Sequence, residues 1–211
     1  MRRLNQIYLK VLTWLHNYLY YKISKISTKL NNNVHVKHRI INYKQFFLTN
    51  IEKNSKVLDI GCGNGFLTCK IAEKAQKVVA IDISKEAISN AKNNFARENI
   101  EYVIGDATKY NFKEHFDIIV LSNILEHIYK RIEFLKKIKN LAEKFLIRVP
   151  LINRSWLSIY KKELGVDYRL SKSHYIEYTL QSFKNEIESV DFKIYSYSIQ
   201  FGEIWAIVEK I

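Results

Sequence analysis

The sequence is poor in the residues that mark linkers and covalent cross-links. Its 211 residues include one proline, six glycines and two cysteines. With so little proline and glycine, no flexible or Pro-rich linker divides the chain into two folding units. The cysteines, Cys62 and Cys69, are too few for a disulfide framework or a cysteine-based zinc site. A reducing compartment is the simplest setting for such a chain, and we predict a cytoplasmic protein.

The sequence also lacks any block of like charges, although its net charge is +13. A basic chain can attract nucleic acid, an anionic membrane or an acidic small substrate. The lysines are spread along the whole chain, which indicates a compositional bias and solvated faces rather than a nucleic-acid groove. A small acidic molecule is therefore favoured as the partner over nucleic acid, which stays an alternative.

No long apolar run is present near the N-terminus. Apolar residues recur at helical spacing from Leu4 to Leu30, but Lys10, His16 and Asn17 interrupt them. A signal peptide or a membrane-spanning helix would need a continuous apolar core, so both are disfavoured. We predict an amphipathic helix that forms a lid over the core. Peripheral membrane contact and a dimer contact are the alternatives.

From residue 56 onward, short β-branched runs alternate with stretches of helical periodicity. The predicted strands are residues 57–60, 77–81, 102–104, 116–121, 144–149, 192–200 and 203–209. The predicted helices are residues 38–51, 66–74, 85–98, 124–141, 155–164 and 179–190. This alternation predicts a parallel sheet with helices on both faces, and the tight turn at Gly202 makes the last two strands antiparallel. We divide the chain into an N-terminal helical extension, residues 1–50, and one domain, residues 51–211.

A glycine-rich turn follows the first predicted strand, with Gly61, Gly63 and Gly65 directly before a predicted helix. Glycines let the backbone approach a ligand, and the N–H groups at the helix N-terminus are free to bind it. The Gly-x-Gly-x-x-Gly fingerprint of dinucleotide binding would need a third glycine where this chain has Phe66. An NAD-dependent oxidoreductase is therefore disfavoured.

Acidic residues follow the next two predicted strands. Asp82 lies about 20 positions after Gly61, the spacing at which nucleotide-binding α/β folds place the acid that accepts the ribose hydroxyls. Asp106 follows the third strand, where it could accept a hydrogen bond from an adenine amine. Acids are also common in turns, but these elements all occur at strand C-termini, where open α/β sheets bind their ligands.

With these residues the chain resembles the class I S-adenosylmethionine-dependent methyltransferases. Residues 57–65 look like their first motif, and residues 116–127 look like their fourth strand and the loop after it, ending in the Glu126-His127 pair common among small-molecule methyltransferases. The resemblance implies a Rossmann-like, doubly wound α/β sheet of seven strands, mostly parallel, with an antiparallel C-terminal edge hairpin. It also implies S-adenosylmethionine as the cofactor. The cofactor-binding residues that it implies are Asp59, Gly61, Gly63, Gly65, Asp82, Ile83, Asp106, Ala107, Ser122 and His127.

Two polar segments beside this core could bind the acceptor, residues 34–43 and 167–178. In this family both regions commonly cover the cofactor pocket, and the second is longer than a simple crossover needs. His174 is the first candidate for a general base, with Tyr175 or Glu177 orienting it. His38 and His127 are the second candidates for that role.

The resemblance implies in-line transfer of a methyl group to an oxygen or nitrogen of a small-molecule or sugar acceptor, and Arg169 could bind an anionic acceptor group. His35 and His38 lack a matching set of acidic or cysteine ligands, so we predict no metal. Residues 122–125 read Ser-Asn-Ile-Leu where methyltransferases of nucleobase amines carry Asn/Asp-Pro-Pro-Tyr, and no cysteine nucleophile lies there. An RNA or protein methyltransferase and a non-catalytic S-adenosylmethionine-binding module remain the alternatives. The oligomeric state stays open.

Overall fold

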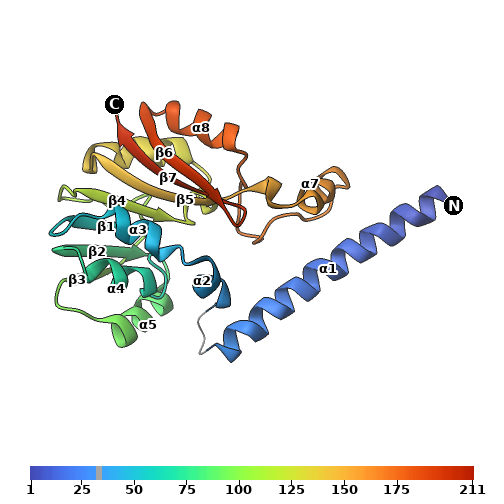
Figure 1. Ribbon diagram of the computed structural model, residues 1–211, viewed down its shortest axis with the longest axis horizontal. Helices are drawn as coiled ribbons and strands as arrows, with labels where there is room; N and C mark the ends of the chain where they lie inside the picture. The colour runs from blue at the N-terminus through green and yellow to red at the C-terminus, as the bar shows by residue number, and fades with distance from the viewer. Residues whose placement is uncertain (32–34) are drawn as a thin grey trace.

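The computed structural model describes residues 1–31 and 35–211 and contains a seven-stranded sheet between helices (Figure 1). The strands are β1 (Lys56–Ile60), β2 (Lys77–Asp82), β3 (Ile100–Ile104), β4 (Ile118–Ser122), β5 (Lys144–Pro150), β6 (Phe192–Gln200) and β7 (Glu203–Lys210). Their order across the sheet is β3-β2-β1-β4-β5-β7-β6. The first five strands pair in parallel, and β7 pairs antiparallel with both β5 and β6. The predicted mostly parallel Rossmann-like sheet with an antiparallel edge hairpin is confirmed.

Burial on both faces explains why the central strands read as continuous apolar runs. Every residue of β1 after Lys56 is buried, and so is every residue of β4 before Ser122. Side chains alternate between the faces, so Leu58 and Ile60 join one hydrophobic cluster while Val57 joins another. Such strands are typical of a parallel sheet that is covered on both sides.

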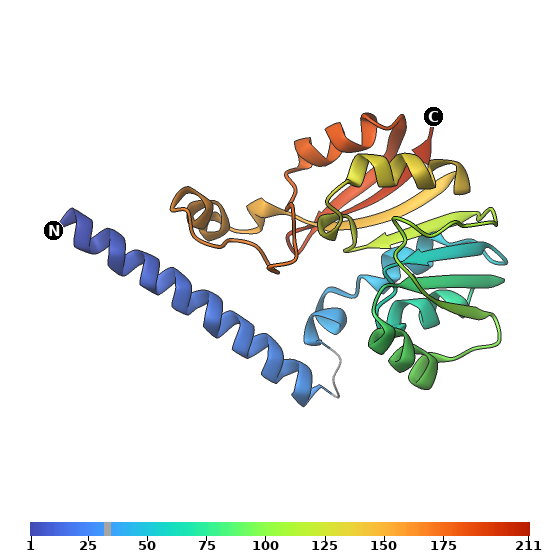
Figure 2. The same ribbon diagram turned by 180° about the vertical axis from the view of Figure 1, so that it is seen from behind.

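Helices form those two covering layers. One face carries α3 (Lys44–Asn50), α4 (Phe66–Ala72) and α5 (Lys85–Phe95), of which α3 and α4 lie in front of the sheet in Figure 1. The other face carries α6 (Arg131–Ile138) and α8 (Leu180–Glu188), which lie in front of it in Figure 2. Phe47 of α3 and Phe183 of α8 are fully buried against these opposite faces. Ligands therefore reach the sheet at its ends rather than at its faces.

The single helix predicted over residues 38–51 was wrong, because the segment forms two helices. These are α2 (Val36–Ile41) and α3, and they are separated at Asn42. Asn42 has φ +44°, the left-handed conformation that asparagine adopts more readily than most residues. The hydrophobic periodicity continues across the break, so it did not reveal the change in direction.

The single helix predicted over residues 124–141 was also wrong. The segment begins with the 3-10 helix η1 (Leu125–His127), continues as α6, and ends in the 3-10 helix η2 (Lys139–Leu141). Asn123 has φ +55° directly before η1. This turn brings Glu126 and His127 to the edge of the sheet instead of placing them along the face of a long helix.

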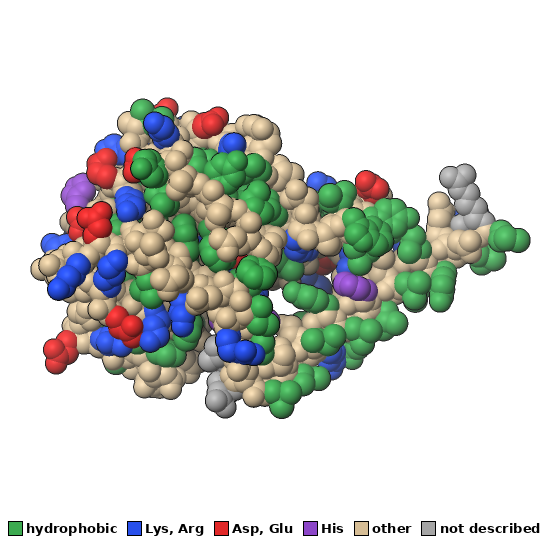
Figure 3. Space-filling view, viewed as in Figure 1, with side chains coloured by type: hydrophobic (Ala, Val, Ile, Leu, Met, Phe, Trp, Pro, Cys, Tyr) green, Lys and Arg blue, Asp and Glu red, His purple; other side chains and the backbone are tan. Residues whose placement is uncertain are grey.

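The N-terminal helix α1 (Arg2–Leu30) lies at one end of the molecule, away from the sheet, in both views (Figures 1 and 2). Large apolar side chains such as Trp14 and Leu4 are exposed along it, and Figure 3 shows hydrophobic atoms on its surface. Asn17 of α1 accepts a hydrogen bond from Lys161 of α7 (Trp156–Glu163). The side-chain amide of Asn17 also donates a hydrogen bond to the carbonyl oxygen of Asp167 in the loop after α7. Within the described residues, no helix is both long and apolar enough to cross a membrane. Val34 of the predicted acceptor segment lies outside the described residues.

Candidate functional site

Two cavities lie at the C-terminal ends of the parallel strands, and Gly61 lines both of them. The first has a volume of about 720 Å³ and is lined by Asp82, Asp106 and His127 among others. The second has a volume of about 560 Å³ and contains Asp59 in its wall. Because the glycine turn separates these cavities, a ligand bound across Gly61 would reach into both.

The turn after β1 is built for glycine. Gly61 has φ +74°, and a Cβ there would lie 2.7 Å from Cδ1 of Ile124. Gly65 has φ +80°, and a Cβ would lie 2.6 Å from the hydroxyl oxygen of Tyr102. Gly63 also has positive φ, but a Cβ there would meet open space at the cavity wall. The first and last glycines are therefore required by packing, while Gly63 leaves room for a ligand beside the backbone.

Two buried or half-buried aspartates flank this turn. The carboxylate of Asp82 accepts hydrogen bonds from the backbone N–H groups of Gly63 and Ser84, each at 2.8 Å. A carboxylate has about four acceptor positions, so Asp82 keeps acceptor capacity toward the first cavity. Asp59 is buried and accepts a hydrogen bond from Thr68 Oγ1 at 2.6 Å. Burial, with a smaller contribution from the charge of Asp82, raises the pKa of Asp59 to about 6.

The far end of the first cavity is formed by the turn after β3. Asp106 and Ala107 line it, together with Ile83 from the turn after β2. Oδ1 of Asp106 accepts hydrogen bonds from the backbone N–H and the hydroxyl of Thr108. These bonds hold the pKa of Asp106 below its usual range, so it carries a negative charge at neutral pH.

These residues fit the cofactor that the sequence implies. Asp82 and Asp106 offer acceptors for the ribose hydroxyls and the adenine amine along the first cavity, and the open space at Gly63 admits a ligand close to the backbone. Asp59 places a carboxyl group on the side of Gly61 where a methionine end would lie. Most of the predicted cofactor residues are thus brought together at one strand edge. Gly65 is the exception, because it packs closely against Tyr102 and lines neither cavity.

The second cavity has a basic and aromatic lining. His38 from α2 and Phe66 from the start of α4 face it with ring centroids 5.9 Å apart, and Ser122 lines it from the end of β4. Burial, followed by the charge of Arg148, lowers the pKa of His38 to about 4. The imidazole of His38 is therefore neutral at physiological pH.

A buried ion pair below this cavity escaped the sequence analysis. Arg148 of β5 donates to both carboxylate oxygens of Glu203 on β7, at 2.6 Å and 3.0 Å. Lys37 lies 2.6 Å from the same carboxylate, and the Arg148 guanidinium lies 4.0 Å from the ring centroid of Tyr43. The sequence signal for this ion pair was Arg148 itself, a charged residue inside the apolar run of residues 145–149. Arg148 lines the second cavity, where its guanidinium is paired with the Glu203 carboxylate.

The predicted catalytic residues of the loop after α7 do not share one environment. Glu177 is buried, where it forms an ion pair with Arg154 and accepts hydrogen bonds from Leu170 N–H and from Nδ1 of His174. Burial opposes its ionisation, but these donors hold its pKa below the ordinary value. Tyr175, by contrast, is 62% exposed and lines the first cavity. Glu177 thus contacts His174 directly, while its orienting role and the general-base role of His174 stay predictions.

The remaining acceptor residues are also separated. His38 lies in the second cavity, on the other side of Gly61 from Tyr175. Arg169 forms an ion pair with Asp167 and donates a hydrogen bond to the carbonyl oxygen of His174. Arg169 therefore supports the loop, and its proposed contact with an anionic acceptor stays a prediction.

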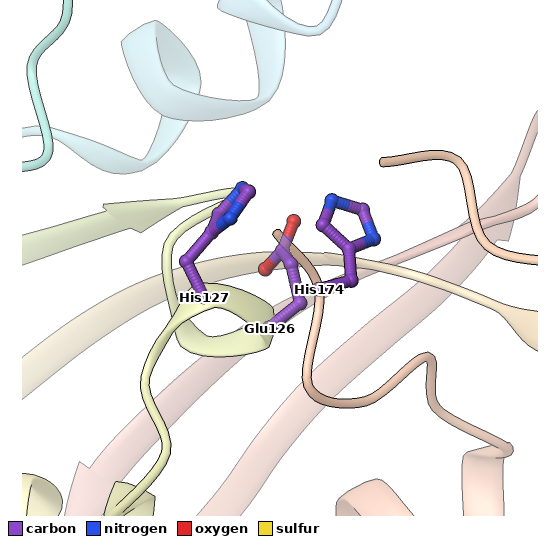
Figure 4. A group of neighbouring side chains, drawn as sticks. All are labelled: Glu126, His127 and His174. Atoms are coloured by element: carbon purple, nitrogen blue, oxygen red, sulfur yellow. The ribbon is translucent and has the colours of Figure 1, made fainter. Parts of the chain in front are cut away.

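The structure brings His174 next to the Glu126-His127 pair (Figure 4). The rings of His127 and His174 meet edge to face with centroids 4.6 Å apart. Glu126 is 1% exposed, and burial raises the pKa of its carboxyl group to about 8. We predicted no metal from the sequence because His35 and His38 lack further ligands. The group of Glu126, His127 and His174 forms only when the distant loop folds back, so the sequence did not reveal it.

Comparisons with known proteins agree with this geometry. A family model described as a methyltransferase domain matches residues 51–163. A ubiquinone biosynthesis O-methyltransferase from Pelagibacter ubique is 33% identical over 122 residues, which cover 56% of this chain and 50% of that protein. A "Probable ribosomal RNA small subunit methyltransferase A" from Pyrococcus furiosus is 32% identical over 137 residues, which cover 63% of this chain and 49% of that protein. The chain thus spans about half the length of the curated relatives that it matches.

Solved structures share the fold at low sequence identity. An S-adenosylmethionine-dependent methyltransferase from Clostridium acetobutylicum matches with a TM-score of 0.64 and 16% identity, over 91% of this chain and 99% of that one. The N-methyltransferase NodS from Bradyrhizobium japonicum, in complex with S-adenosyl-L-homocysteine, matches with a TM-score of 0.60 and 14% identity, over 82% of this chain and 85% of that one.

Proposed function

Because the chain belongs to the methyltransferase-domain family, whose class I members use S-adenosylmethionine, we propose that it transfers a methyl group from this cofactor to an oxygen or nitrogen of a small-molecule or sugar acceptor. The observation that carries the proposal is the second cavity, which begins at the glycine turn and Asp59 and ends at basic and aromatic side chains. Its volume of about 560 Å³ suits a small acceptor.

When bound, the cofactor supplies an electrophilic methyl group on a sulfonium. The chain itself supplies orientation and the removal of water. Asp82 and Asp106 would hold the adenosine part, and the glycine turn with Asp59 would hold the amino-acid part. Neutral His38 and the Arg148 guanidinium face the second cavity, where they would bind and orient a polar or anionic acceptor.

Helix α1 would act as a lid over the acceptor. Tyr20, Ser24 and Thr28 of this helix line the second cavity, and Ser24 Oγ lies 2.8 Å from Nε2 of His35. Deleting residues 1–30 should therefore raise the KM for the acceptor more than it lowers cofactor affinity. If the deletion changed neither, and instead abolished binding to anionic lipid vesicles, the helix would be a membrane contact. We also propose a cytoplasmic location, which the two free cysteines support.

A labelling experiment tests the proposed function. The purified chain is incubated with methyl-labelled S-adenosylmethionine and with separate extract fractions of small molecules, glycans, protein and RNA. Asp82→Asn removes a charge that faces the cofactor, and Asp191→Asn is the control that makes the same change at an exposed aspartate. We expect label in the small-molecule or glycan fraction, about 10- to 100-fold weaker cofactor binding in Asp82→Asn, and no change in Asp191→Asn.

The alternatives have distinct results in the same experiment. Label in the RNA fraction would favour an RNA methyltransferase, which the similarity to the Pyrococcus furiosus protein keeps in view. Label in the protein fraction would favour a protein methyltransferase. Measurable cofactor binding with no label in any fraction would contradict the catalytic proposal.

A further inference from the structure

Three potential metal ligands meet beside the first cavity, and they come from two segments of the chain. Glu126 and His127 belong to η1 after β4, and His174 belongs to the loop after α7. One ligand atom from each residue lies within 4.8 Å of the others. Figure 4 shows the three side chains converging on one space at the edge of the sheet.

Among the described residues, no other residue donates a hydrogen bond to the carboxyl group of Glu126. The residue is 1% exposed, and both of its carboxyl oxygens are buried without a hydrogen-bond partner. Buried polar atoms are nearly always paired, because losing water without a replacement costs several kcal/mol, on the order of 2–7 for a neutral group. The fold therefore presents two unused oxygen acceptors toward two imidazole rings.

The hydrogen bond of His174 to its other neighbour sets the tautomer of the ring. Its Nδ1 lies 3.1 Å from Glu177 Oε1, and Glu177 is held in place by Arg154. Since a carboxylate accepts this bond, Nδ1 carries the proton and Nε2 is free to act as a ligand. Nε2 is also the ring nitrogen of His174 that points toward Glu126 and His127 in Figure 4. A carboxylate behind the ring is the usual support of a metal-binding histidine.

The two segments are locked to each other at this point. The backbone N–H of Tyr175 donates to the carbonyl oxygen of Glu126 at 2.8 Å, directly after His174 in the chain. A tetrahedral ion with bonds of about 2.1 Å needs ligand atoms about 3.4 Å apart. Because the ligand atoms now lie within 4.8 Å of one another, each distance would shorten by at most about 1.4 Å. Side-chain rotations of His127 and Glu126 can supply this without moving the backbone.

We propose that Glu126, His127 and His174 bind a divalent transition-metal ion. Two imidazoles and one carboxylate favour ions such as Zn²⁺ and Mn²⁺ over Mg²⁺ and Ca²⁺, which prefer oxygen ligands throughout. Three protein ligands leave coordination positions open, as in catalytic rather than structural sites. His127 lines the first cavity beside Gly61, which also lines the second, so an acceptor in the second cavity would reach the ion past the glycine turn.

The ion would narrow the acceptor class of the proposed function, on which this step rests, to a hydroxyl. A coordinated hydroxyl has a lowered pKa and loses its proton to solvent. Its oxygen then forms the new bond to the methyl carbon, while the carbon–sulfur bond breaks and leaves its electron pair on sulfur. The ion keeps its charge throughout, so the step needs no oxidant or reductant.

Calorimetric titration with the metal ion alone tests the site. The full chain, stripped with a chelator, is titrated with Zn²⁺, Mn²⁺ and Mg²⁺ in the absence of cofactor and acceptor. The variants are Glu126→Gln, His174→Ala and, as a matched control, His115→Ala at an exposed histidine. We expect one Zn²⁺ or Mn²⁺ per chain, weaker Mg²⁺ binding, and a loss of at least about 10-fold in affinity for the first two variants only.

A second measurement does not depend on how the variants fold. Crystals of the unaltered chain soaked in Zn²⁺ should give an anomalous peak between the three side chains, and Zn²⁺ should raise the thermal unfolding temperature of the unaltered chain. Absence of that peak, or equal affinity in Glu126→Gln, His174→Ala and the unaltered chain, would overturn the proposal. Because no methyl transfer is measured, these results are independent of whether the proposed function holds.

Discussion

Neutralising Glu203 should destabilise the fold at neutral pH and have much less effect in acid. The Glu203 side chain is 2% exposed, and its carboxylate contacts two cations. Arg148 Nε donates to it at 2.6 Å, and Lys37 Nζ lies 2.6 Å from its other oxygen. Although burial disfavours the charge, Arg148 and then Lys37 lower the pKa of Glu203 to about 2.

The magnitude follows from this pKa and from the sign of its shift. The gap between the ordinary value of 4.5 and the folded value of about 2 corresponds to about 3 kcal/mol. Because the folded pKa is depressed, this stabilisation is present above pH 4.5 and is lost as the pH falls toward 2. Glu203→Gln also leaves two cations without a counter-ion, and breaking a buried pair typically costs about 3–5 kcal/mol.

Urea unfolding at pH 7 and pH 3 measures this difference. We expect Glu203→Gln to lower the free energy of unfolding by about 3 kcal/mol at pH 7, and by less than half of that at pH 3. The control is Glu101→Gln on β3, where a glutamate pairs with Lys77 at the surface and should contribute at most about 1 kcal/mol. A loss in Glu203→Gln that matched the control, or that did not change with pH, would refute the reasoning.

Three further predictions concern the turn, the second cavity and the core. Gly65→Ala should lower the free energy of unfolding by about 1–3 kcal/mol in urea titrations, because φ is +80° and a Cβ would lie 2.9 Å from that of Ala91; unchanged stability would show that the turn relaxes freely. The imidazole of His38, followed by NMR from pH 7 downward, should stay neutral until the pH approaches 4; titration near 6.5 would mean that the ring is solvated. Phe47→Ala should cost about 3–5 kcal/mol in the same urea titrations, since the ring is fully buried between α3 and the sheet; a cost below 1 kcal/mol would mean that the site collapses around the smaller side chain.

Features that are local in the sequence could be predicted from it. The strand after Lys56 and the acids after β2 and β3 were found because a parallel strand buried on both faces is a short apolar run and its turn carries polar residues. The hairpin of β6 and β7 is also a local feature, because the tight turn at Gly202 leaves the two strands no arrangement other than antiparallel pairing.

Features that depend on distant contacts could not be predicted. Arg148 and Glu203 are 55 positions apart, and each reads as an isolated charge until β5 and β7 pair. His174 likewise lies in a loop without periodicity, so its approach to Glu126 is visible only after the loop folds back. The break at Asn42 was missed because an apolar pattern records which residues are buried and not whether the helix axis continues.

Most of the buried ionisable side chains lie toward the end of the sheet at which the parallel strands finish. Among the side chains whose burial the structure describes, the buried acidic and basic ones are Asp59, Glu126, Arg148, Lys161, Glu177 and Glu203. Asp59, Glu126 and Arg148 lie at or just after the ends of parallel strands, and Glu203 begins β7 opposite the end of β5. Lys161 lies on α7, and Glu177 lies in the loop that follows it. At the opposite edge, Lys56 and Lys144 start their strands at least partly exposed to solvent. A folding requirement alone would not favour one edge, because buried ionic groups seldom increase stability over apolar ones of similar size. Asp59 and Arg148 line the second cavity, and a concentration of ionisable groups at this end of the strands is what a site that binds a charged cofactor and a polar acceptor would require.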